Sequence, residues 1–524
     1  MESPQHGCCL PRTGTRRPGP GIVRSVFDPR PGNSYTPGIM AKRIRNVYEN
    51  PLVTRNASAE MCEVFSPQRR VATWRRIWIA LAEAQRELGL PISAAQIAAL
   101  RRACDAIDFD RAARYERQTR HDVMAHLYTF GDAAPCARGI LHLGATSMDV
   151  VDNADLIVMR EALRQIAAWL ANVVEALGRF ARRYRDLPTL GFTHYQPAQL
   201  TTVGKRACLW CNDFVRDLDE VEHRIAGLRF RGIRGATGTQ ASFLSLLGSA
   251  ARVRRLEQLV AKKLGFDRIE PVTGQTYSRK VDGQVAHALA GIAASAHKFA
   301  NDLRLLANLK EMEEPFEKGQ VGSSAMAYKR NPMLCERATG LARYVLSIAT
   351  SPLQNAAEQW LERTLDDSAN KRLSIPEAFL ATDGILRIVT HVARGMVVYP
   401  RTIAAHVRAE LPFMATEEIL MAAVSTALKQ GDRKAADRQA LHERIRRHSQ
   451  AAARQVKQMG RPNDLIERLQ ADPAFARIDW SRALDPSRYT GLSVRQTDAF
   501  LREYVDPIVR RYKRVLGRRA DLNV

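Results

Sequence analysis

The stretch from Asp152 to Phe180, DNADLIVMREALRQIAAWLANVVEALGRF, carries the strongest structural signal in the chain. Its apolar residues recur in alternating steps of three and four, at Leu156, Met159, Leu163, Ile166, Leu170, Val173, Leu177 and Phe180. Heptad spacing of this kind is typical of a long helix whose apolar seam packs against partner helices. A helix of about thirty residues is ~45 Å long, well beyond the usual length in globular proteins.

Two further apolar seams lie downstream of this stretch. The regular one consists of Leu289, Ile292, Ala296, Phe299, Leu303 and Leu306, and the less regular one of Val203, Ala207, Trp210, Phe214, Leu218, Val221, Ile225 and Leu228. No stretch alternates with period two, so the sequence predicts an all-α fold with a bundle of long helices packed at shallow angles. We interpret the seams as core and not as cofactor contacts, and a bundle this long commonly recruits other subunits.

Composition divides the chain into a tail and three helical domains. Residues 1–39 are rich in Pro and Gly and hold five arginines but only two acids, which predicts a disordered tail or a stretch upstream of a start at Met40. The expected domains are an N-terminal helical domain over 40–146, a central long-helix bundle over 147–398 and a C-terminal helical domain over 399–524.

Membrane, secretory and metal-binding signals are missing from the sequence. No apolar run approaches the ~18 to 20 residues that a spanning helix needs, and no secretory h-region follows the first methionine. We therefore expect a soluble, cytoplasmic protein with no membrane partner. The eight cysteines form no framework, and the Cys208 and Cys211 pair lies in a helical pattern, which favours packing over a zinc site.

The charge balance is strongly positive, with 79 Lys and Arg against 55 Asp and Glu. Such an excess indicates anionic partners, and nucleic acid is the first class to consider. The basic residues are scattered along helices among acidic neighbours, however, and no nucleic-acid motif accompanies them. A polyanionic small substrate is therefore favoured over nucleic acid as the partner.

The loop from Gln320 to Met333, QVGSSAMAYKRNPM, combines two serines with Lys, Arg and Asn side chains, and is called the signature loop below. Such a loop suits the binding of an anion and the motion of a lid, although most polar loops simply connect helices. Gly322 is expected to adopt a backbone conformation closed to other residues. Asn331-Pro332 delays the next helix until near Met333.

Other polar stretches interrupt the helical pattern, mostly at predicted helix ends. They span residues 119–122, 142–147, 193–197, 273–275 and 363–372. Together they supply histidines able to exchange protons near neutral pH and several cations able to hold carboxylates or phosphate. A Gly-rich turn over 231–240 lacks the ending of a phosphate-binding P-loop, so we expect it to connect bundle helices.

A resemblance to a known family adds to this interpretation. Ser323, Lys329 and the following Arg-Asn-Pro resemble the signature loop of the fumarase/aspartase superfamily, and Tyr328 with the segment ERTLDDS at 362–368 narrows the resemblance to the adenylosuccinate lyases. It extends from about Pro51 nearly to the C-terminus. Near rivals are other fumarate-releasing lyases, acting on argininosuccinate or fumarate. A more distant rival is a non-catalytic basic helical protein.

The resemblance implies three helical domains, a homotetramer with shared active sites, and a C–N lyase that needs no cofactor or metal. Adenylosuccinate lyases release fumarate by β-elimination from adenylosuccinate, giving AMP, and from succinyl-aminoimidazole carboxamide ribotide, giving the carboxamide ribotide, in purine nucleotide biosynthesis. The implied catalytic residues are His194 as acid, Ser323 as base, Lys329 and His121. The implied substrate-binding residues are Arg55, Asn56, Arg120, Asp122, Thr146, Ser147, Thr193, Gln275, Ser324, Asn331, Arg337, Arg363, Ser368 and Arg372. Two positions depart from the family pattern, since Asn56 stands where tyrosine is common and Ala327 where proline is usual.

Overall fold

The computed structural model describes residues 46–522, so the tail expected over residues 1–39 lies outside the described residues. The described chain is helical apart from two short antiparallel sheets, which confirms the all-α fold class. The first sheet pairs β1 (Pro188–Thr193) with β2 (Gln196–Thr202), and the second pairs β3 (Met312–Glu313) with β4 (Val397–Val398).

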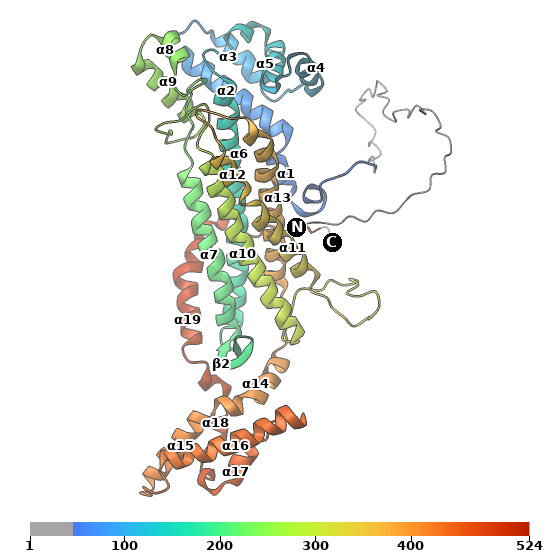
Figure 1. The fold of residues 1–524 in the computed structure, drawn as a ribbon, viewed down its shortest axis with the longest axis vertical. Helices are drawn as coiled ribbons and strands as arrows, with labels where there is room; N and C mark the ends of the chain where they lie inside the picture. The colour runs from blue at the N-terminus through green and yellow to red at the C-terminus, as the bar shows by residue number, and fades with distance from the viewer. Residues whose placement is uncertain (1–45, 523–524) are drawn as a thin grey trace, which may run out of the picture. The chain divides into compact units, whose positions relative to one another are not determined.

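The central bundle consists of four long helices and two shorter ones. They are α6 (Ser147–Arg183), α7 (Val203–Gly227), α10 (Lys280–Asn308), α11 (Met333–Ile348), α12 (Ser351–Ala357) and α13 (Asp366–Gly395). In Figure 1, α7 and α10 run side by side along the bundle, and α6 packs against both α7 and α13. All eight seam residues of α6 are buried, as are all six of α10, which confirms that the seams are core.

The N-terminal helices lie beside one end of the bundle, and those from Pro67 onward form a second core. They are η1 (Leu52–Asn56), α1 (Ala59–Val64), α2 (Pro67–Glu87), α3 (Ala94–Ala103), α4 (Phe109–Thr119), α5 (Asp122–Ala133) and η2 (Pro135–Ile140). The Ser66 side chain caps α2, and Ser93 with Gln96 forms a capping box on α3. Two further helices, α8 (Ala241–Leu247) and α9 (Ala250–Lys263), lie near α2 in Figure 1.

The C-terminal helices form a third core and then return to the bundle. They are α14 (Pro400–Met414), α15 (Thr416–Lys429), α16 (Arg438–Met459), α17 (Leu465–Ala471), η3 (Pro473–Phe475), α18 (Trp480–Ala483), η4 (Pro486–Tyr489), α19 (Ser493–Phe500), η5 (Leu501–Val505), α20 (Asp506–Arg511) and η6 (Lys513–Val515). Leu501, Val505 and Ile508 are buried in the same core as the α6 seam. Beyond them, Asn172 of α6 donates to the Val515 carbonyl at 2.9 Å and accepts from the Arg518 amide at 3.2 Å.

Contacts place Glu49–Val524 in one compact unit, so the domain boundaries near residues 146 and 398 remain a proposal. Both positions do coincide with helix starts, at α6 and α14. Across residues 46–522, no single helix is both long and apolar enough to cross a membrane, and the sharply bent pair α14–α15 meets that test by length and composition alone.

The β1–β2 hairpin is the part of the fold that hydrophobic periodicity missed. β1 buries the successive residues Thr189 and Leu190, and a register shift follows between Leu190 and Phe192, so no period-two pattern results. Thr193 pairs with Gln196, which leaves His194 and Tyr195 as a two-residue turn with φ of 53° and 58°. Turns of this type match strand twist but require left-handed backbone, which is uncommon outside glycine.

Candidate active site

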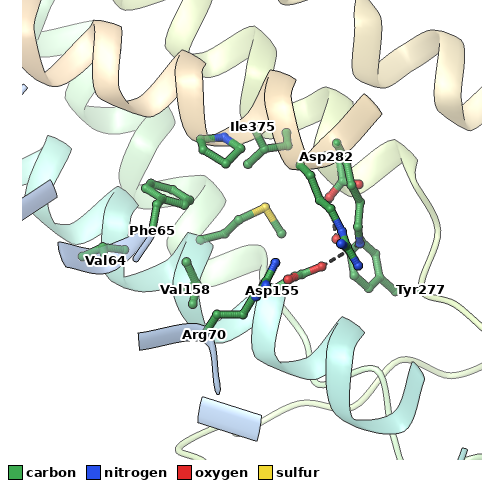
Figure 2. Close-up of a pocket in the computed structure, with 12 residues that line it drawn as sticks. Val64, Phe65, Arg70, Asp155, Val158, Tyr277, Asp282 and Ile375 are labelled. Atoms are coloured by element: carbon green, nitrogen blue, oxygen red, sulfur yellow. Dashed lines mark hydrogen bonds and ion pairs between the residues drawn. The ribbon is translucent and has the colours of Figure 1, made fainter. Parts of the chain in front are cut away.

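A cavity of about 300 Å³, called the site pocket below, lies where the ends of α5, α6 and α13 meet α2 and the loop before α10. Eight of the predicted site residues line it: His121, Asp122, Thr146, Ser147, Gln275, Arg363, Ser368 and Arg372. They come from four separate stretches of sequence, so the expectation that helix ends converge holds for this set. A smaller cavity of about 130 Å³, called the side cavity, adjoins the site pocket and shares four lining residues with it (Figure 2).

The rim of the site pocket is organised by the start of α5. His121 caps this helix, accepting the Met124 amide at 3.4 Å through Nδ1, while its Nε2 lies 3.3 Å from the Ser147 hydroxyl. Asp122 binds Arg372 of α13 at 2.9 Å. Burial would raise the pKa of Asp122, but the Arg372 hydrogen bond and charge hold that pKa below its ordinary value. Arg120 ends α4 with φ of 55° and is exposed, outside the pocket lining.

Asp149 is the buried anchor beneath this rim. Its carboxylate accepts the Thr146 amide at 2.8 Å and the Arg234 amide at 2.7 Å, and it pairs with the fully buried Arg231. The Gly-rich turn thus surrounds the Asp149 carboxylate of its own chain. Because this carboxylate accepts the backbone N–H groups of the turn, they are not available to bind a phosphate. The turn connects α7 of the bundle to α8, which lies outside the bundle, so the prediction that it joins two bundle helices holds for one of them. Arg231 also binds the Gln275 carbonyl.

A second buried ionic network supports the floor of the pocket. Arg279 binds Asp152 at 3.0 Å and Asp367 at 2.6 Å, and Lys371 binds Asp155 at 2.6 Å. Burial would raise the pKa of Asp152, but the adjacent Arg279 and Lys371 cations hold it below its ordinary value. These residues and Asp149 were not predicted from sequence. The Thr146 to Asp149 capping box was a usable signal, whereas Arg279 and Lys371 carried none.

His194 and Thr193 lie outside this pocket lining, on the β1–β2 turn. Both residues are exposed. The hairpin is held to the bundle by Arg206 of α7, whose guanidinium binds the Leu190 carbonyl and lies over the Phe192 ring. The hairpin is therefore fixed to α7, and its turn exposes the His194 side chain.

The signature loop also lies outside the pocket lining, between β3 and α11. The Ser323 hydroxyl oxygen accepts the amides of Ala325 at 3.3 Å and Met326 at 3.1 Å. Two amide donors favour a negatively charged oxygen, which is what a serine base requires. Ser324 and Lys329 are exposed in the same loop.

Gly322 is required in the loop for a different reason from the one predicted. Its φ is not among the positive values, but a Cβ there would lie 2.2 Å from the Lys329 carbonyl oxygen. The two limbs of the loop approach too closely for any side chain. Asn331 reinforces this contact by donating to the Gly322 carbonyl at 2.8 Å, and α11 then begins at Met333, as expected.

The remaining predicted residues form a third group at the N-terminal end of the described chain. Arg337 donates to the Asn56 side chain at 2.9 Å and to the Arg55 carbonyl at 3.1 Å. Asn56 is buried, and its amide nitrogen binds the Pro51 carbonyl at 2.9 Å. Arg337 is thus a neighbour of the Arg55-Asn56 pair despite lying far from it in sequence, and the Asn56 side chain is hydrogen-bonded on both sides.

Comparisons with known proteins give the family. Residues 56–347 match the lyase family model, and residues 412–500 match the model of the adenylosuccinate lyase C-terminus. The chain is 51% identical to adenylosuccinate lyase of Schizosaccharomyces pombe, over 90% of this chain and 97% of that protein. It is 48% identical to adenylosuccinate lyase of Saccharomyces cerevisiae, over 91% and 99%.

Solved structures agree on the fold. The 3-carboxy-cis,cis-muconate lactonizing enzyme of Pseudomonas putida superposes with a TM-score of 0.72 at 24% identity, covering 89% of this chain and all of that one. A fumarate lyase from Mesorhizobium gives a TM-score of 0.71 at 25% identity, covering 87% and all of that chain. These matches concern the fold, whereas the family models and the sequence relatives establish that the chain belongs to the adenylosuccinate lyase family.

Proposed function

We propose that the chain releases fumarate by β-elimination from adenylosuccinate, giving AMP, and from succinyl-aminoimidazole carboxamide ribotide, giving the carboxamide ribotide. The observation that carries the proposal is the 51% identity to an adenylosuccinate lyase over nearly the whole of both chains. The site pocket supports it, because five Arg and Lys side chains line it against three Asp, which suits a polyanionic nucleotide.

In the proposed mechanism Ser323 is the base. Its alkoxide removes a proton from the carbon next to a substrate carboxylate, and the electron pair builds a dianionic aci-carboxylate. The amides of Ala325 and Met326 already point at this oxygen and stabilise its charge before reaction. Lys329, six residues later in the same loop, neutralises the dianion. The electrons then form the double bond of fumarate as the C–N bond breaks.

His194 is the proposed acid, which gives its proton to the departing purine nitrogen. The tight turn at His194 and Tyr195 fixes the direction in which the imidazole is presented. His121, bridged to Ser147 at the pocket rim, orients the bound substrate and completes the set of proposed catalytic residues. The predicted substrate-binding residues of the site pocket then hold the succinyl, ribose and phosphate groups.

We further propose a cytoplasmic homotetramer in which each active site draws residues from more than one subunit. The support is the exposure of His194 and Lys329 on segments that lie outside the pocket lining of their own chain. An exposed acid cannot exclude water from the reacting atoms, and a neighbouring protomer would bury it. Native mass measurement tests the assembly.

A substrate panel tests the reaction. Purified protein is mixed separately with adenylosuccinate, argininosuccinate and malate, while fumarate and AMP absorbance are followed. We expect turnover of adenylosuccinate alone. Turnover of either other compound in its place would identify a different lyase, and no turnover of any would favour the non-catalytic rival.

A further inference from the structure

The cations of the site pocket differ in how far their own chain neutralises them. Arg279 is paired with Asp152 and Asp367, both in the buried network described above. Lys371 and Arg372 are likewise paired, with Asp155 and Asp122. Arg363 lies 4.0 Å from Asp367, and its Nη1 is buried without a partner among the described residues.

Arg70 of α2 is the least neutralised of the five. Among residues 46–522 its guanidinium makes no ion pair, and its Nε is buried without a hydrogen-bond partner. The group lies over the Trp74 ring at 5.4 Å, which fixes its plane. Burial, and then the charge of Arg372, lowers the pKa of Arg70. Leaving such a group unpaired costs stability unless a ligand supplies the missing acceptor.

The position of Arg70 places these donors where a ligand can reach them. The residue lines both the site pocket and the side cavity. Figure 2 shows it beside Asp155 at the edge of the side cavity, with Val64, Phe65 and Val158 forming the apolar wall. Asp155, Asp122 and Glu116 are near enough to influence Arg70. Asp155 and Asp122 are each held by another cation, and the exposed Glu116 of α4 forms no ion pair with Arg70 within residues 46–522. An anion from outside the chain can supply the missing acceptor.

We propose that the Arg70 guanidinium, together with Arg363, binds an anionic oxygen of the substrate, either phosphate or carboxylate, and is a further substrate-binding residue of this site. The inference rests on the proposed function. Guanidinium groups bind both classes of oxyanion through paired N–H donors, and charge-assisted bonds of this kind are the stronger ones in proteins. Arg70 was hidden in the sequence because its neighbours Val71 and Trp74 belong to a core stripe.

The test compares Arg70→Met with a matched control, Arg69→Met. Arg69 is the adjacent arginine but binds Glu161 at 2.5 Å and does not line either cavity. We expect Arg70→Met to raise KM for adenylosuccinate by about 10- to 100-fold with a much smaller change in kcat. Arg70→Lys, which keeps the charge but loses the planar fork, should recover part of this loss. Arg69→Met should leave KM unchanged.

Product inhibition identifies the group that is bound. AMP carries the phosphate without the succinyl group, and fumarate carries only carboxylates. If Arg70→Met weakens inhibition by AMP but not by fumarate, Arg70 binds the phosphate. If it weakens inhibition by fumarate but not by AMP, Arg70 binds a carboxylate. Unchanged KM, or equal weakening of both inhibitors, would overturn the proposal, since the latter indicates general damage to the site.

Two safeguards keep the outcome decisive. If Arg70→Met fails to fold by circular dichroism, Arg70→Gln is measured with the same readouts. The wild-type protein is assayed alongside, because wild-type inactivity toward adenylosuccinate would reject the proposed function. Active wild type with an unaffected Arg70→Met rejects only the role of Arg70.

Discussion

One chain assembles the site pocket by itself. It leaves two other predicted site segments, the β1–β2 turn and the signature loop, exposed and outside that pocket. In the site pocket, helix ends from four stretches already meet, and Asp149 and Arg279 are buried beneath them with their partners in place. His194 and Lys329, in contrast, are exposed and do not belong to that lining. From this difference we propose that the binding groups are preorganised within one protomer and that the reacting groups are supplied by neighbouring protomers.

The largest expected effect concerns the reacting groups. Ser323→Ala should lower kcat by about 10²- to 10⁴-fold, because it removes the proposed base. KM and melting temperature should hardly change, since within residues 46–522 the hydroxyl is hydrogen-bonded to amides of its own loop alone. Steady-state kinetics with adenylosuccinate measure the effect. The neighbouring Ser324→Ala is the control and should lose far less, and a near-normal kcat for Ser323→Ala would remove Ser323 from its role.

Mixing inactive variants tests whether the reacting groups come from different protomers. Ser323→Ala and His194→Ala are unfolded together and refolded, or exchanged as subunits, in equal amounts. If each site takes its serine and its histidine from different chains, about one quarter of sites recover both. Activity should rise to about that fraction of wild type. No recovery, with mixed oligomers demonstrated by mass, would place both residues in one chain.

A smaller effect is expected from the scaffold of the site pocket. Asp149→Ala leaves the Arg231 guanidinium buried without its carboxylate and frees the Arg234 amide. Breaking one side of a buried pair costs about 3–5 kcal/mol of unfolding free energy. Denaturant unfolding measures this loss. The exposed Asp110→Ala in the first turn of α4 is the control and should cost far less.

The smallest effect is a pH dependence near the same pocket. Burial, with the nearby Arg70 and Arg75 cations, lowers the pKa of His126 to about 4. Because the unfolded chain binds this proton near pH 6.5 and the folded chain does not, stability falls as pH drops from about 6.5 to about 4, by at most about 3 kcal/mol. His126→Gln should flatten this part of the stability profile measured by denaturant unfolding. An unchanged slope would show that other groups cause it.

Sequence patterns predicted the parts of the fold that depend on repetition. The heptad seam of α6 correctly predicted a long buried helix, because the residue at each step of three or four is buried against a partner helix. The hairpin at 188–202 was missed, since its two consecutive buried residues and its register shift erase alternation. Gly322 was identified as necessary, but the reason, the approach of the Lys329 carbonyl, exists only in three dimensions.

The candidate site was predictable where short motifs carried it. Asp122, Ser147 and Arg372 were named from motifs and lie together in the pocket lining. Arg70 and Lys371 were not named, because a charged residue on a buried helix face has no local signature until the opposing helices are known.

The return of the chain end to α6 has a consequence for biosynthesis. The core around α6, which begins at Ser147, includes Leu501, Val505 and Ile508. Asn172 of α6 also binds the backbone of residues 515 and 518. Translation proceeds from the N-terminus, so α6 is made long before these partners leave the ribosome. The bundle can reach its final packing only after residues 501–518 have left the ribosome, and a stop codon before Leu501 would remove this layer from α6.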